Sequence, residues 1–127
     1  MPKEILVTGS TGLVGSRFLE LSPDYHLLTP GHKELNIADN SSVEAFFDRH
    51  QPGLIINFAA YTNVSEAENQ TGDTNKPCWQ INVIGVENLL KTHIPLIQIS
   101  TDMVFSGSSQ DPGPYSEDHP SPNTLET

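Results

Sequence analysis

Three glycines stand three residues apart in the stretch VTGSTGLVG, at positions 9, 12 and 15. An apolar run ending at Thr8 predicts a buried strand before them, and apolar residues at helical spacing predict a helix after them. Gly9 then permits a tight turn, Gly12 lets a pyrophosphate approach the backbone, and Gly15 lets the helix pack closely on the strand. In this strand–turn–helix context the spacing favours dinucleotide binding over a glycine-rich turn without a ligand.

The start of that helix is itself suited to phosphate. Its first N–H groups have no partner within the helix and lie at the positive end of the helix dipole. Ser10 and Thr11 add hydroxyl donors. Because these groups act locally, an anionic ligand is expected here although the chain carries 16 acidic against 6 basic residues, a net charge of −10.

The composition of the chain disfavours several other classes of protein. The acidic surface disfavours nucleic acid as a partner. No apolar run approaches the roughly 18 residues of a membrane-spanning helix, and the N-terminus does not have the pattern of a secretion signal. Cys78 is the single cysteine, so we expect no internal disulfide and no metal site, and a cytoplasmic location.

Strands and helices alternate along the chain. The strands are apolar throughout rather than alternating, which is typical of a parallel sheet covered by helices on both faces. The sequence therefore predicts one doubly wound (Rossmann) domain over residues 1–127, with strand order 3-2-1-4. Strands are expected at 4–8, 25–29, 54–60 and 96–100, and helices at 13–22, 41–50 with a serine cap, and 78–93.

The segment after the second strand bears on the cofactor. A typical NAD site has an acidic residue there to hold the ribose hydroxyls. This chain has TPGHK at 29–33, with no acid until Glu34. Lys33, with His32 beside it, can meet a 2′-phosphate, so the sequence favours NADP, while NAD and a merely solvated loop lysine stay open.

Further stretches of the sequence accompany the glycine fingerprint. They are ELNIAD (34–39), NFAAYTNVSEAE (57–68), INVIGVENL (81–89), ISTDMVFSG (99–107) and PYSEDHPSPNTL (114–125). Together with the fingerprint they resemble the extended short-chain dehydrogenase/reductase family, and within it the dTDP-4-dehydrorhamnose reductases. The glycine fingerprint is shared widely, whereas the segments that begin at Asn57 and Ile99 are specific. The resemblance covers essentially the whole chain.

The resemblance implies a set of cofactor contacts. Asn36 and Ile37 would flank the adenine, and Ala59, Ala60 and Tyr61 would form a wall at the end of the third strand. Thr62 would lie near the nicotinamide ribose. The pyrophosphate site would be lined by Gly9, Ser10, Thr11, Gly12, Leu13 and Val14, with Gly15 behind them.

The resemblance also implies catalytic roles. Thr101 would donate a hydrogen bond to the substrate carbonyl as hydride arrives, and Asp102 would orient substrate or hold its loop. A cap or turn role is the alternative for both. Asn82, taken as a buried amide in the middle of a helix, would support the site. Met103 and Ser106 depart from the family pattern, which has Tyr and Asp there.

The family's proton donor is a Tyr followed four residues later by a Lys. None of Tyr25, Tyr61 and Tyr115 has such a Lys, and aligned on PSPNTL the Tyr would fall directly after Thr127. We therefore expect these residues to be the N-terminal, incomplete part of a longer protein. By themselves they should bind cofactor weakly and should not turn over substrate.

Three functions follow as hypotheses. The first is the cofactor half of an NAD(P)H-dependent reductase acting on a nucleotide-activated 4-keto sugar in dTDP-rhamnose biosynthesis, a homodimer being one option for the whole protein. The second is a non-catalytic NADP-binding regulatory subunit similar to the β subunit of methionine adenosyltransferase. The third is a nucleotide-sugar epimerase or dehydratase, against which the STDMVFSG segment argues.

Overall fold

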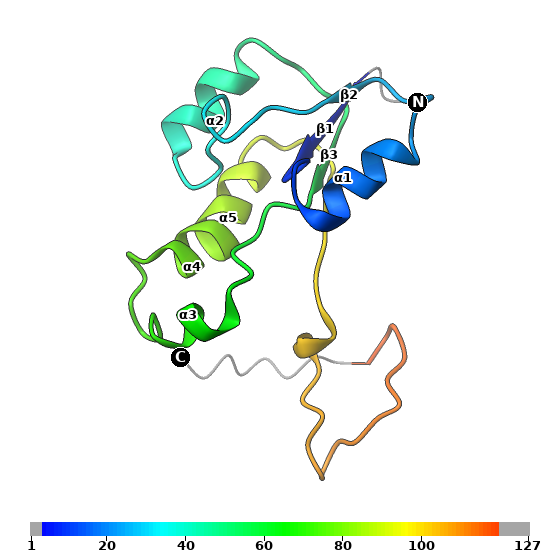
Figure 1. Ribbon diagram of the computed structural model, residues 1–127, viewed down its shortest axis with the longest axis vertical. Coiled ribbons are helices and arrows are strands. Elements are labelled where there is room, and N and C mark those ends of the chain that lie inside the picture. Colours follow the sequence, from blue (N-terminus) through cyan, green and yellow to red (C-terminus); the bar gives the residue numbers. More distant parts are fainter. Residues whose placement is uncertain (1–3, 120–127) are drawn as a thin grey trace.

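The computed structural model describes residues 4–119 and contains one four-stranded parallel sheet (Figure 1). A single continuous helix runs from Pro77 to Leu90, with a π-helical middle. The strands are β1 (Ile5–Thr8), β2 (Leu27–Leu28), β3 (Leu54–Asn57) and β4 (Leu96–Gln98). The helices are α1 (Leu13–Glu20), α2 (Asn40–Phe47), α3 (Val64–Glu68), α4 (Pro77–Trp79), η1 (Gln80–Ile84), α5 (Gly85–Leu90) and the 3₁₀ turn η2 (Asp102–Val104).

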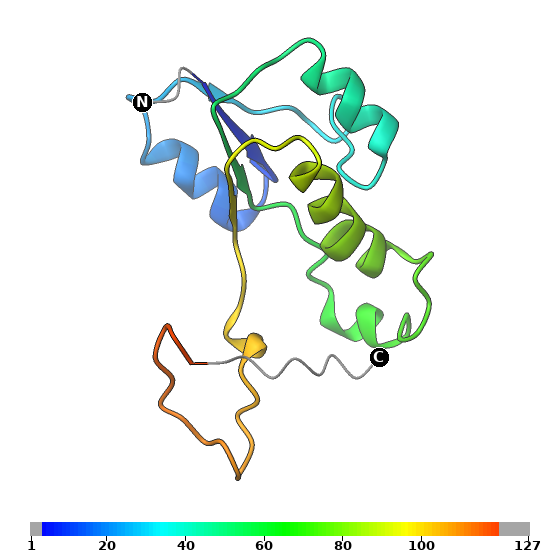
Figure 2. The ribbon, with the colours of Figure 1, turned by 180° about the vertical axis from the view of Figure 1, so that it is seen from behind.

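Helices cover both faces of the sheet, as the apolar strands predict (Figures 1 and 2). Successive strand residues point to opposite faces. Leu6 and Ile55 therefore pack with residues of α2 and α5, whereas Val7 and Ile56 pack with residues of α1. The doubly wound parallel architecture is confirmed.

The predicted strand order 3-2-1-4 is wrong, because the sheet runs β2-β1-β3-β4. β3 is buried over Ile55–Asn57 and pairs on both sides, with β1 and with β4. In the predicted order β3 would have paired only with β2, a half-buried strand of two residues. Between β1 and β4 the buried strand β3 has a hydrogen-bonded neighbour on each side, whereas outside β2 it would have had only that short strand as a partner.

The start of α2 also differs from expectation. The side chain of Asp39, rather than a serine, caps α2 by accepting a hydrogen bond from the N–H of Ser41 at 3.0 Å. The hydroxyl of Ser42 instead accepts from the N–H of Asn36, also at 3.0 Å. Asp39 precedes the first helical residue, where a carboxylate satisfies free amides and complements the helix dipole.

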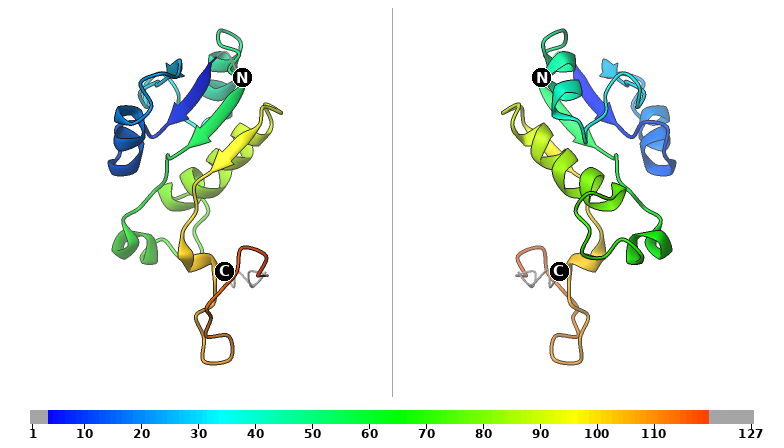
Figure 3. Two further views of the ribbon diagram at one scale, coloured as in Figure 1. Left: turned by 90° about the vertical axis from the view of Figure 1, so that its right-hand side faces the viewer. Right: turned by 90° about the vertical axis from the view of Figure 1, so that its left-hand side faces the viewer.

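β4 forms an open edge of the sheet, and the segment after it leads away from the strands (Figure 3). Ile97 is 48% exposed and Ile99 43%. Unpaired apolar edges pair readily with other chains. We therefore expect an isolated chain of residues 1–127 to self-associate in sedimentation experiments, and Ile97→Lys to reduce that association. A wild-type chain that stays a monodisperse monomer would contradict this.

Within residues 4–119, no helix combines the length and the apolar character that crossing a membrane requires.

Candidate functional site

The turn between β1 and α1 depends on two glycines. Gly9 has φ of +65°, and a Cβ built on it would lie 2.5 Å from the backbone nitrogen of Ala59. A Cβ on Gly15 would overlap the carbonyl oxygen of Gly9. The backbone after β3 and the first turn of α1 thus both lie close against this corner. At Gly15 the helix packs on the turn at Gly9 and Ser10.

The first turn of α1 has free backbone donors. Gly12 occupies the N-cap position without a capping side chain, and α1 has no acidic residue in its first turn. Among the hydrogen bonds of residues 4–119, none is donated by the N–H groups of Leu13, Val14 or Gly15. Leu13 is 91% exposed and Val14 59%, so two apolar side chains stand in solvent beside these donors. This combination suits an anion attached to a flat or apolar ligand.

The corner opens into a groove of about 580 Å³ at the carboxyl ends of the strands. Open α/β sheets bind ligands at this edge. Predicted site residues that line it are Gly9, Ser10, Thr11, Gly12, Leu13, Val14, Gly15, Asn36, Ile37, Ala59, Ala60 and Thr62. It is also lined by Thr8, Pro30, Gly31, His32, Leu35, Phe58 and Ile81.

The groove lining lacks the acidic residues that dominate the chain as a whole. None of the lining residues is an aspartate or glutamate, and His32 is the one that can carry a positive charge. In a chain with a net charge of −10, a groove free of carboxylates keeps the donors of α1 accessible to an anion.

Five predicted residues do not line the groove: Lys33, Tyr61, Asn82, Thr101 and Asp102. Asn82 is exposed rather than buried, which corrects the expectation for it. It nevertheless accepts from the N–H of Tyr61 at 2.8 Å and donates to the carbonyl of Tyr61 at 3.1 Å. Asn82 thus holds the backbone that continues the Ala59–Ala60 wall.

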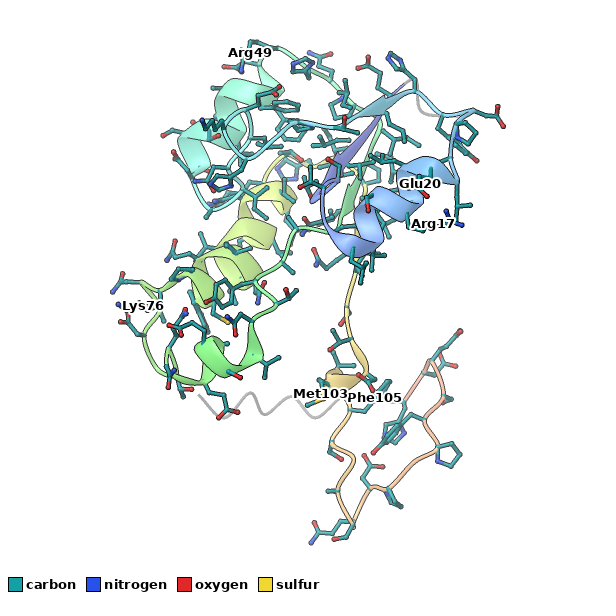
Figure 4. All side chains as sticks on the ribbon, viewed as in Figure 1. Arg17, Glu20, Arg49, Lys76, Met103 and Phe105 are labelled. Carbon is teal, nitrogen blue, oxygen red and sulfur yellow. The ribbon has the colours of Figure 1, made fainter. Side chains whose placement is uncertain are left out.

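Thr101 and Asp102 follow β4 and are exposed. The hydroxyl of Thr101 accepts from the N–H of Met103 at 3.3 Å and so caps η2, the alternative role considered for it. Figure 4 shows Met103 and Phe105 at this turn, beyond the end of β4. Residues 120–127, which carry the end of the PYSEDHPSPNTL match, lie outside the described part of the chain.

Asn36 makes a local turn. Its Oδ1 accepts from the N–H of Ala38 at 3.1 Å. A carbonyl oxygen has two lone pairs, so Asn36 keeps one acceptor position beside the groove.

Between residues 4 and 119, no three His, Cys, Asp or Glu side chains group as metal ligands would.

Asn57 was missed as a site residue. It has no exposed surface and links three strands. Its Oδ1 accepts from the hydroxyl of Thr8 on β1 and from the N–H of Ala59 at 3.2 Å, and its Nδ2 donates to Oε1 of Gln98 on β4 at 2.7 Å. A polar residue ending an apolar strand was the signal that could have identified it.

The sequence and the fold of the chain are similar to those of known proteins. Residues 3–126 match the family described as RmlD substrate binding domain. The chain is 33% identical over 120 residues to the dTDP-4-dehydrorhamnose reductase of Aggregatibacter actinomycetemcomitans, covering 89% of this chain and 39% of that protein. It is also 33% identical over 131 residues to methionine adenosyltransferase 2 subunit beta of Xenopus laevis, covering 91% and 36%.

A solved structure shares the fold. The dTDP-4-dehydrorhamnose reductase of Bacillus anthracis in complex with NADP superimposes with a TM-score of 0.73 at 32% identity, over 84% of this chain and 39% of that one. The chain therefore spans about two fifths of the length of these reductases.

Proposed function

Because the chain belongs to the RmlD substrate binding domain family, we propose that it forms the NADPH-binding part of a reductase of nucleotide-activated 4-keto sugars. The whole protein would then resemble the dTDP-4-dehydrorhamnose reductases to which the chain is similar. Residues 1–127 would be one Rossmann domain of that enzyme.

The groove at the β1–α1 corner is the observation that carries the proposal. Three free N–H groups, the absence of carboxylates in the lining and the missing Cβ atoms at the turn together suit a pyrophosphate. The strand-end wall of Ala59 and Ala60 suits a flat ring, since small side chains leave room for it. Asn36 and Ile37 line the groove and would flank the adenine.

The remaining residues would serve the reaction. When bound, NADPH supplies the hydride that reduces the C4 carbonyl of the sugar. Thr101 would donate its hydroxyl proton in a hydrogen bond to that carbonyl oxygen, where negative charge develops. Asp102 would orient the substrate or hold the turn. Thr62 would bound the nicotinamide end of the groove. Tyr61 would continue the Ala59–Ala60 wall, with Asn82 fixing its backbone.

A preference for NADPH over NADH tests the cofactor assignment. His32 lines the groove and Lys33 follows it, and no acid lies between the end of β2 and Glu34. Ion-paired hydrogen bonds to the 2′-phosphate should make NADPH bind about tenfold more tightly than NADH in calorimetry. The double variant His32→Ala, Lys33→Ala should bind the two alike. Equal wild-type affinities for both would contradict the preference.

A second function is supported by the similarity to methionine adenosyltransferase 2 subunit beta. A regulatory subunit of that kind would keep the cofactor groove without turning over a sugar. Consumption of NADPH in the presence of a dTDP-4-keto sugar, measured on the protein as its gene encodes it, separates the two.

We also propose a cytoplasmic location, because a single cysteine fits a reducing compartment. A homodimer remains a proposal for the whole protein.

A further inference from the structure

The amide of Asn57 can take only one orientation among its partners. Its oxygen faces two donors, the hydroxyl of Thr8 and the N–H of Ala59. Its nitrogen must therefore face an acceptor, because an amide NH₂ only donates. Asn57 is fully buried, so an unmet donor there would carry its full desolvation cost.

Gln98 supplies that acceptor from the neighbouring strand. Its Oε1 lies 2.7 Å from Nδ2 of Asn57, and its own Nε2 donates to the carbonyl of Ile99 at 2.9 Å. β3 and β4 pair with Asn57 opposite Gln98, so the sheet register brings the two amides together. Gln98 itself is exposed, and its side chain fills no space in the core.

The contact reaches the groove through one further bond. Asn57 holds the N–H of Ala59, and Ala59 both lines the groove and lies against Gly9, where a Cβ would come within 2.5 Å of its nitrogen. Without an acceptor at position 98, the Asn57 amide gains a partner only by rotating, which releases Ala59. The wall beside the pyrophosphate corner then loses its anchor.

We propose that Gln98 is a positioning residue for the cofactor: through Asn57 it fixes the Ala59 wall against the Gly9 corner. This inference rests on the proposed function. It also connects the groove to the end of β4, after which the turn at Thr101 begins. A side chain outside the groove lining would thereby set the affinity for the dinucleotide.

The test compares Gln98→Met, which keeps the length but removes the acceptor, with Gln98→Glu, which keeps an acceptor oxygen. Gln98→Met should bind NADPH about tenfold more weakly in calorimetry, and Gln98→Glu should bind like the wild type. In NMR spectra the side-chain NH₂ protons of Asn57 should exchange with solvent faster in Gln98→Met alone.

A control separates positioning from general instability. Val43→Ala removes buried volume from α2, outside the groove lining, and should lower the unfolding midpoint without weakening NADPH binding. Should Gln98→Met not fold, Gln98→Ala repeats the test by truncating an exposed side chain. If the variants that lack the acceptor bound NADPH as tightly as the wild type, the inference would be overturned. It would also be overturned if Gln98→Glu bound NADPH as weakly as Gln98→Met. No binding by the wild type would instead overturn the proposed function.

Discussion

Leu13→Glu is expected to weaken NADPH binding about 50-fold while leaving the fold intact. Leu13 is the first residue of α1 and is 91% exposed, so its replacement removes nothing from the core. A carboxylate in the first turn favours the helix by about 0.3–1 kcal/mol. The same carboxylate competes for the free N–H groups and repels a pyrophosphate. Calorimetry with NADPH, beside urea unfolding, would record both effects.

Leu13→Gln is the matched control for this experiment. Glutamine has nearly the same shape as glutamate but no charge, so it should bind NADPH within about threefold of the wild type. If the Glu and Gln variants bound NADPH equally, electrostatic attraction at the start of α1 would not be the basis of binding.

Gly15→Ala is expected to damage both the fold and the groove. The added Cβ would overlap the carbonyl oxygen of Gly9, a backbone atom, so α1 must move away from the corner. Overpacking of this kind costs about 3 kcal/mol of unfolding free energy, and displacement of α1 should abolish detectable NADPH binding. Urea unfolding and calorimetry provide the two measurements.

Gly31→Ala is the matched control, since the chemical change is the same. Gly31 also lines the groove, but a Cβ there would meet nothing within 4 Å. Its unfolding free energy should stay within about 0.5 kcal/mol of the wild type. Equal losses of stability in both variants would mean that the corner is not packed as described.

What could be predicted from the sequence was mainly local. The spacing of Gly9 and Gly15 encodes the corner directly, because the turn and the first helical turn lie within seven residues. The alternating pattern of strands and helices likewise predicted the parallel sheet. Asn82 was expected to be buried from its apolar neighbours, yet its exposed amide is held by the backbone of Tyr61.

What failed depended on contacts between distant segments. The order of the strands depends on which strands pair with the two edges of β3. The sequence of one strand does not show which other strands it pairs with. The bond between Asn57 and Gln98 spans 41 residues and requires the β3–β4 register. The groove is also lined by Leu35, Phe58 and Ile81, which come from separate segments of the chain. Their place in the lining depends on the folded structure and has no local signal in the sequence.

A titration of the ¹⁵N-labelled chain with NADP⁺, followed by NMR, would show whether a dinucleotide binds at the start of α1. We expect saturable shifts that are largest at the amides of Leu13, Val14 and Gly15, with further shifts at Ala59 and Ala60. Inorganic pyrophosphate should move the three α1 amides and leave the alanines largely unaffected. Saturation with NADP⁺ that leaves those three amides unmoved, or no saturable change at all, would contradict dinucleotide binding at this helix start.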